Sequence, residues 1–167
     1  LLGRVQDRLA AAGAELPAFE ILPVYPVAGA PWILRPQDAG SWLVDAAPGL
    51  APEKVVQGAL AAAGIEAEIV HSTSWRYQDR RLVLTYLAVA SHAIQAEGFE
   101  ALRSERAELA RGSARGAPRS IDVGQVVEHG LRHLSWLSRD DRVIAEELTP
   151  EWLAIVARYQ PEPFRAL

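Results

Sequence analysis

The sequence of 167 residues contains no cysteine, a single lysine and no long apolar run. Without cysteine, the chain cannot form a disulfide, a thiolate nucleophile or a cysteine metal site. A membrane-spanning helix needs about 18 consecutive apolar residues, and no stretch of the sequence approaches that length. We therefore expect no membrane among its partners.

Positive charge is also scarce. The formal net charge is -4, and because nucleic-acid binding depends on clustered cations, the sequence gives no nucleic-acid signal. The N-terminal stretch LLGRVQDRLAAAGAELP carries charges throughout. It lacks the apolar core and cleavage site of a secretory signal. These features predict a cytoplasmic protein.

What is present fits one globular domain. Half of the residues are hydrophobic and 23% are charged, as is usual for a soluble protein that buries a core. We predict a single domain over residues 1–167. It has an N-terminal helix over 1–13, a sheet with one helix over 17–90, and C-terminal helices over 121–160.

Residues 17–36, PAFEILPVYPVAGAPWILRP, are rich in β-branched and aromatic side chains. Proline cannot donate to a sheet ladder, so Pro23, Pro26 and Pro31 predict short strands at edges or bulges. Residues 41–49, SWLVDAAPG, predict another short strand that runs into a turn.

Residues 48–69, PGLAPEKVVQGALAAAGIEAEI, have the pattern of a turn, a helix and a strand. Pro52 and Glu53 suit a first helical turn, and Gly64 suits the helix end. The apolar face comprises Val55, Val56, Ala59, Leu60 and Ala63. We expect the small residues of GALAAAG to let this helix lie close against a sheet.

Two alternating segments follow the helix. Residues 65–78 place Ile65, Ala67 and Ile69 on one side of a strand, and residues 79–90 have the strongest strand pattern in the chain. Together they predict a hairpin that turns near residues 78–80.

Residues 92–120 are charged and interrupted by glycine, which predicts a helix in their middle and a loop over 110–120. Residues 123–140 predict an amphipathic helix. A last helix is predicted from Thr149 as N-cap, with Pro150 in its first turn.

The order strand, turn, helix, glycine, strand and hairpin in residues 41–90 resembles the surroundings of the Nudix box, G-x5-E-x7-R-E-U-x-E-E-x-G-U, where U is aliphatic. Trp42 and PGLAPE at 48–53 resemble the entry into that family's helix, and AGIEAEIV at 63–70 resembles its exit. The resemblance covers under a third of the chain. It implies an α/β (α+β) mixed-sheet sandwich, here with extra N-terminal and C-terminal helices.

The acids of the box are missing from this helix. Anchored on Gly64, the motif R-E-U-x-E-E falls on residues 57–62, QGALAA; anchored on Pro52, it falls on residues 58–63, GALAAA. The family's glutamates bind Mg²⁺, which needs hard oxygen ligands, and alanine and glycine supply none. We expect no Mg²⁺ at this helix and predict no cofactor.

His129 and His133 are the candidates for chemistry elsewhere. At i and i+4 they project from one helix face, where two imidazoles could bind a metal or a ligand. The metalloprotease pattern H-E-x-x-H needs a Glu after the first His, and that position holds Gly130. Two histidines also leave a zinc site short of ligands. The alternative is a hydrogen-bonded or solvated pair at the border of the apolar stripe.

Trp75 and Tyr77 share one face of the predicted hairpin, where they could line an aromatic cleft. Packing in the core is the alternative. With His129 and His133, these two aromatic residues form the predicted ligand-binding set.

The sequence thus predicts a Nudix-fold protein without metal-dependent pyrophosphohydrolase activity, acting as a ligand-binding or protein-interaction module. Its partner would be a small nucleotide-like ligand, another protein or a second copy of the chain. The alternative is a divergent hydrolase of a nucleoside-diphosphate-linked substrate that uses the two histidines and acids of residues 97–108. A third hypothesis makes the sandwich a scaffold for an exposed apolar helix face in residues 151–159.

Overall fold

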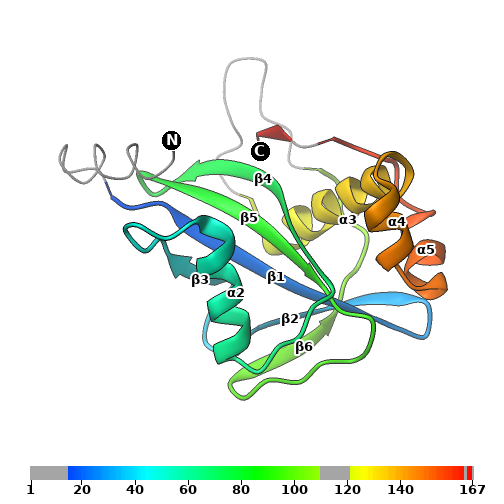
Figure 1. Ribbon diagram of the computed structural model, residues 1–167, viewed down its shortest axis with the longest axis horizontal. Helices are drawn as coiled ribbons and strands as arrows, with labels where there is room; N and C mark the ends of the chain where they lie inside the picture. The colour runs from blue at the N-terminus through cyan, green and yellow to red at the C-terminus, as the bar shows by residue number, and fades with distance from the viewer. Residues whose placement is uncertain (1–14, 110–120, 164, 167) are drawn as a thin grey trace.

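The computed structural model describes residues 15–109, 121–163 and 165–166 (Figure 1). The helix predicted over 1–13 and the loop predicted over 110–120 lie outside these residues. The elements in chain order are β1 (Ala18–Val27), β2 (Ala30–Pro36), β3 (Trp42–Asp45), α2 (Pro52–Ala62), β4 (Ile69–Gln78), β5 (Arg81–Val89), β6 (Phe99–Arg103), α3 (Val123–Asp140), α4 (Arg142–Glu147), α5 (Pro150–Val156) and β7 (Arg165–Ala166).

The strands form one mixed sheet. Its order is β6-β2-β1-β5-β4-β7, and β3 also pairs with β1. The β1–β5 and β4–β7 pairs are parallel, and the other pairs are antiparallel. This sheet and the helices packed on it confirm the predicted α/β class.

β1 lies in the centre of the sheet, so the prediction of short or edge strands for its residues is wrong. One flank of β1 pairs with β3 as far as Ile21 and with β2 from Val24 onward, which leaves Pro23 unpaired on that flank. The Val24 carbonyl faces the other flank, where it accepts the Ala90 N–H at 2.9 Å. Because neighbouring residues direct their backbone groups to opposite flanks, the Pro23 nitrogen faces the gap and loses no ladder bond.

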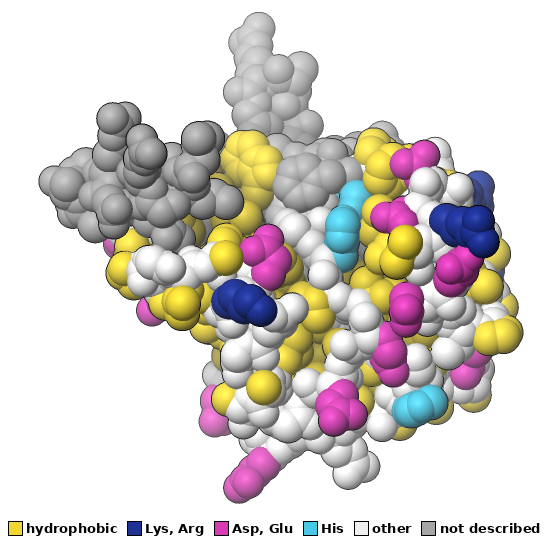
Figure 2. All heavy atoms as spheres, in the orientation of Figure 1, with side chains coloured by type: hydrophobic (Ala, Val, Ile, Leu, Met, Phe, Trp, Pro, Cys, Tyr) yellow, Lys and Arg dark blue, Asp and Glu magenta, His cyan; other side chains and the backbone are white. Residues whose placement is uncertain are grey.

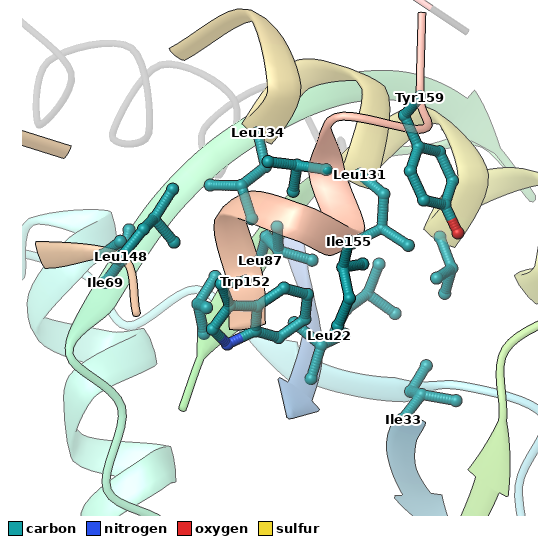
Figure 3. Close-up of a cluster of buried hydrophobic side chains, with 14 of the residues drawn as sticks. Leu22, Ile33, Ile69, Leu87, Leu131, Leu134, Leu148, Trp152, Ile155 and Tyr159 are labelled. Carbon is teal, nitrogen blue, oxygen red and sulfur yellow. The ribbon is translucent and has the colours of Figure 1, made fainter. Parts of the chain in front are cut away.

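Two apolar cores lie on the two faces of the sheet. α2 covers one core, which contains Phe19, Tyr86, Val56 and Leu60. α3 and α5 cover the other. Figure 3 shows that core, where sheet residues meet helix residues; its members include Leu22, Leu87, Leu131, Leu134, Trp152 and Ile155. Each fully buried side chain of this size contributes about 1.5–3 kcal/mol.

Two local predictions are wrong. Ile65 and Ala67 pack into the α2 core, whereas Ile69 packs into the α3 core. The reason is that β4 begins only at Ile69, so the loop before it does not follow strand alternation. Residues 99–103, within the stretch 92–120 whose middle is predicted to be helical, form β6, because pairing with β2 supplies a ladder that the local sequence does not reveal.

The β4–β5 hairpin turns at Asp79 and Arg80, within the predicted range. Both residues have positive φ angles, 48° and 66°, as a type I′ turn requires. The Tyr77 hydroxyl donates to the Arg80 carbonyl at 2.8 Å. A non-glycine residue in this conformation is locally strained.

The predicted starts of the C-terminal helices are confirmed. Asp122 forms a capping box with Gln125 at the start of α3, and Thr149 accepts the Trp152 N–H at 3.2 Å. α5 buries its large apolar residues except Leu153, which is 39% exposed. The described part of residues 151–159 therefore presents no broad apolar face, which counts against the scaffold hypothesis. No described helix has the length and apolarity to cross a membrane.

Candidate functional site

α2 lies between β3 and β4, where the Nudix-like pattern is found. It packs on the sheet through Val56 and Leu60, which are buried. Its exposed residues include Gln57, Gly58, Ala61 and Ala62. Glu53 in the first turn is the one carboxylate of α2. Anchored on Gly64, the positions that match the family's acids are Gly58, Ala61 and Ala62, which reach solvent as a glycine and two methyl groups.

Close packing explains only some of the small residues of α2. Ala59 and Ala63 pack against the core, as predicted. Gly58 does not pack against any neighbour. Apart from its chain neighbours and its own helix backbone, no described atom lies within 4 Å of the place where a Cβ would stand. A glutamate side chain would have room at this position.

A hollow of about 690 Å³ lies beside the C-terminal part of α2. Its walls are Gln57, Leu60 and Ala61 of α2, together with residues 64–68 and Val70 of the segment that leads into β4. The floor is therefore apolar, and the rim carries an amide and carboxylates. A hollow of this size and mixed character suits a small organic ligand.

The hollow is electrostatically negative. Glu66 and Glu68 belong to its lining, and no Lys or Arg of the described residues does. Glu68 accepts the Ser91 N–H at 2.8 Å. The C-terminal end of α2, which carries partial negative charge, also reaches the hollow. Figure 2 shows acidic side chains spread over this face and few basic ones. Such a surface disfavours an anionic ligand.

Trp75 and Tyr77 lie on β4, on the sheet face that α2 covers, beside Leu84 and Leu82 of β5. Trp75 is 41% exposed and Tyr77 is 71% exposed. The core-packing alternative is therefore wrong for both rings. Neither residue lines the hollow beside α2.

His129 and His133 lie on the opposite face, in the buried contact between α3, β4 and the segment after α5. Nε2 of His129 is 3.3 Å from the Thr73 carbonyl, and its Nδ1 is 3.4 Å from the Glu162 carboxylate. Nδ1 of His133 donates to the Glu162 carbonyl at 3.1 Å. The His133 ring also stacks on His71, with centroids 5.4 Å apart. Both α3 histidines are at most 1% exposed.

Burial sets the protonation of this histidine group. The pKa of His133 is lowered from 6.5 to about 4, mainly by burial and also by the neighbouring histidines, while the hydrogen bond to Glu162 opposes the shift. Burial also lowers the pKa of His71. His71 and His133 are therefore neutral at pH 7, and they hold the chain segments together by stacking and by the His133 hydrogen bond to Glu162. No group of three or more His, Asp or Glu side chains arranged for a metal occurs among the described residues.

Glu128 joins α3 to the segment after β6. Arg106 binds its carboxylate through Nε and Nη2, both at 3.0 Å, and Arg132 binds it through Nε at 2.9 Å. Burial raises the pKa of the Glu128 carboxyl, but the hydrogen bonds from these arginines and the Ala107 N–H outweigh it and hold the pKa below its usual 4.5. Glu128 is therefore an ionised buried anchor.

A second buried ion pair links three neighbouring strands of the sheet, β1, β5 and β4. Arg76 of β4 binds the Glu20 carboxylate of β1 through both Nη atoms, at 2.6 and 3.1 Å, and Thr85 of β5 donates to it at 2.9 Å. Sequence reasoning missed this group because its members are 9 to 65 residues apart. Three polar residues on inward-facing strand positions were the available signal, but no local pattern shows that they meet.

The structure thus divides the predicted ligand-binding set. Trp75 and Tyr77 are exposed on the α2 face, whereas His129 and His133 are buried on the α3 face. The four residues do not form one site. The hollow beside α2 uses residues that sequence reasoning treated only as helix and strand punctuation.

Of the comparisons with known proteins, the one with solved structures finds similar chains. No protein-family profile matches the chain, and no curated protein matches it. Among solved structures, the chain is similar to the crystal structure of a Nudix hydrolase from M. Smegmatis, RenU, with 16% sequence identity, coverage of 87% of this chain and 84% of that chain, and a TM-score of 0.36.

Proposed function

We propose that this chain is a ligand-binding module with a Nudix-like fold, and that it does not catalyse metal-dependent pyrophosphate hydrolysis at α2. The main support is that the exposed positions of α2 that match the family's acids, Gly58, Ala61 and Ala62, carry no acid. Gly58 has free space around its Cα and lacks a carboxylate all the same. Steric exclusion therefore does not account for the missing ligands, and the alanine and glycine at these positions offer Mg²⁺ no side-chain oxygen.

The lining of the hollow favours a neutral or cationic group over a bare pyrophosphate. Two carboxylates, Glu66 and Glu68, and the end of α2 repel anions, and the described lining has no cation to offset them. The Gln57 amide can donate and accept hydrogen bonds, and Leu60 and Val70 supply apolar contact. The uncharged nucleoside part of a nucleotide-like ligand matches this chemistry.

The absence of hydrolysis is tested with nucleoside diphosphate derivatives in Mg²⁺. We expect no release of phosphate or nucleoside monophosphate by the purified chain. Mg²⁺-dependent release that disappears in the paired variant Glu66→Gln with Glu68→Gln would refute the proposal, because those carboxylates would then serve as metal ligands.

Binding is tested by NMR titration with a nucleoside and with the matching nucleoside diphosphate, without metal. The nucleoside should bind at least as tightly, and Ala61→Trp, which fills the hollow from an exposed position on α2, should abolish its binding. Ala154→Trp places the same ring at an exposed position on α5 and is the matched control. Equal binding by both variants, or preference for the diphosphate, would contradict a ligand site in this hollow.

A further inference from the structure

A second, smaller hollow lies away from α2, where the β1–β2 turn, the segment after β6 and the end of α5 meet. Its volume is about 140 Å³, and its lining includes Pro31, Arg103, Glu105, Arg106, Arg158 and Tyr159. Three of these residues are cations in a chain whose net charge is -4. A single water occupies about 30 Å³ of liquid, so the space holds roughly five non-hydrogen atoms. A tetrahedral oxyanion has five.

Arg106 is held rigidly at this hollow although its side chain is 54% exposed. Its Nε and Nη2 bind Glu128, and its Nη1 donates to the Arg158 carbonyl at 3.2 Å. Its guanidinium lies over the Tyr159 ring, 4.3 Å from the centroid. Figure 3 shows the Tyr159 ring at the edge of the α3 core, so the arginine rests on a packed support. An arginine ordered before binding loses little conformational entropy when it meets a ligand.

The positive charge of this hollow is only partly neutralised. Glu128 pairs with both Arg106 and Arg132, and Arg132 also pairs with Glu162 at 3.4 Å, so the uncompensated charge of the hollow comes mainly from Arg158. Arg158 donates through Nη2 to the Gly29 carbonyl, which is a neutral acceptor. Among the described residues, no carboxylate lies within ion-pair distance of Arg158. Arg103 and Glu105 are 3.8 Å apart with exposures of 62% and 81%, a contact that an incoming anion can displace at little cost.

We propose that this hollow binds a phosphate group between the guanidinium groups of Arg106 and Arg158. After the hydrogen bonds described above, Arg106 retains two N–H groups, one on each Nη, and Arg158 retains the other N–H groups of its guanidinium. Arginine forks match the oxygen spacing of phosphate, and charge-assisted hydrogen bonds to it are about twice as strong as neutral ones. The group is carried either by free orthophosphate or by a phosphomonoester. This site is independent of the hollow beside α2, because the two share no residue.

The test is an NMR titration of the full chain with inorganic phosphate, with sodium chloride of equal ionic strength as reference. We expect saturable shifts at the amides of residues 104–107 and 158–159 with phosphate alone. Phenyl phosphate distinguishes the two sources: equal or tighter binding indicates a phosphomonoester, and loss of binding indicates orthophosphate. Absence of saturable shifts with both anions, or equal shifts in chloride, would overturn the proposal.

Variants separate a phosphate site from general electrostatics. Arg158→Gln removes one exposed charge and should weaken binding about tenfold, the effect of one charge-assisted hydrogen bond. Arg142→Gln removes the same charge from α4, where the side chain is 91% exposed, and should leave binding unchanged. Arg158→Lys keeps the charge but loses the planar fork, so its affinity should lie between those of the parent chain and Arg158→Gln. Equal loss in the α4 variant, or no loss in Arg158→Gln, would show that the hollow is not the binding site.

Discussion

Lowering the pH below 6.5 should destabilise the protein through His133. This ring is 1% exposed, and its Nδ1 donates to the Glu162 carbonyl. It also stacks on His71 and Trp136. Adding a proton would place a full charge in this buried stack, which is why burial lowers the His133 pKa to about 4.

The direction of the change in the free energy of unfolding follows from which state binds the proton. Between pH 6.5 and about 4 the unfolded chain protonates this histidine and the folded chain does not. The free energy of unfolding is therefore unaffected by His133 above pH 6.5, falls as the pH drops, and levels off below about 4. At about 1.4 kcal/mol for each pH unit, the total loss is about 3 kcal/mol. His71, whose pKa is also lowered, adds to the loss.

The assay is urea denaturation followed by tryptophan fluorescence at several pH values. With an m-value of about 2 kcal/mol per M, the midpoint should fall by about 1.5 M between pH 7 and pH 4. His133→Gln keeps a donor for the Glu162 carbonyl and cannot be protonated, so its profile should be flatter in this range. An NMR titration midpoint near 6.5 for the His133 ring, or an unchanged slope in the variant, would refute the reasoning.

Three further predictions concern other contacts, each measured by urea denaturation at pH 7. Arg80→Gly relieves a side chain at φ 66° and should raise the free energy of unfolding by about 1 kcal/mol; a decrease would contradict a strained turn. Gly58→Ala should raise it by about 0.5–1 kcal/mol, because the added methyl group has open space in mid-helix; a loss would mean that the position is packed. Glu20→Gln should lower it by about 3–5 kcal/mol by leaving Arg76 buried without its carboxylate, while Glu20→Leu combined with Arg76→Met should cost less than the two single changes together; additive costs would contradict the pairing.

The sequence predicted best those structural features that depend on residues close together in the chain. Pro52 and Gly64 bracket α2, Thr149 caps α5, and the β4–β5 turn lies where alternation breaks. Each of these features depends on neighbours within a few residues. The prolines of β1 led to a wrong prediction. Whether a strand tolerates a missing N–H depends on which distant strand lies beside the proline, and Pro23 faces the gap between β3 and β2.

The candidate sites depend even more on distant contacts. Arg106 and Glu128 meet across 22 residues, and Arg76 and Glu20 across 56. Within the sequence each is an ordinary charged residue, and arginine supplies nearly all cations of this chain. Only burial distinguishes Glu20 and Glu128 from the many solvated carboxylates, and burial of a charge is tolerated only when a partner arrives from another element.

The alanines and glycines of α2 show the same limit within a single helix. A small residue is compatible with close packing and with an open surface, and periodicity alone does not choose between them. Ala59 and Ala63 are small because the core lies against them, whereas Gly58 and Ala61 are small at exposed positions. Since Ala61 also lines the larger hollow, a longer side chain there would occupy the volume that a ligand needs. The short side chains on the outer face of α2 therefore offer no side-chain oxygen and leave the volume of the hollow open at the same time.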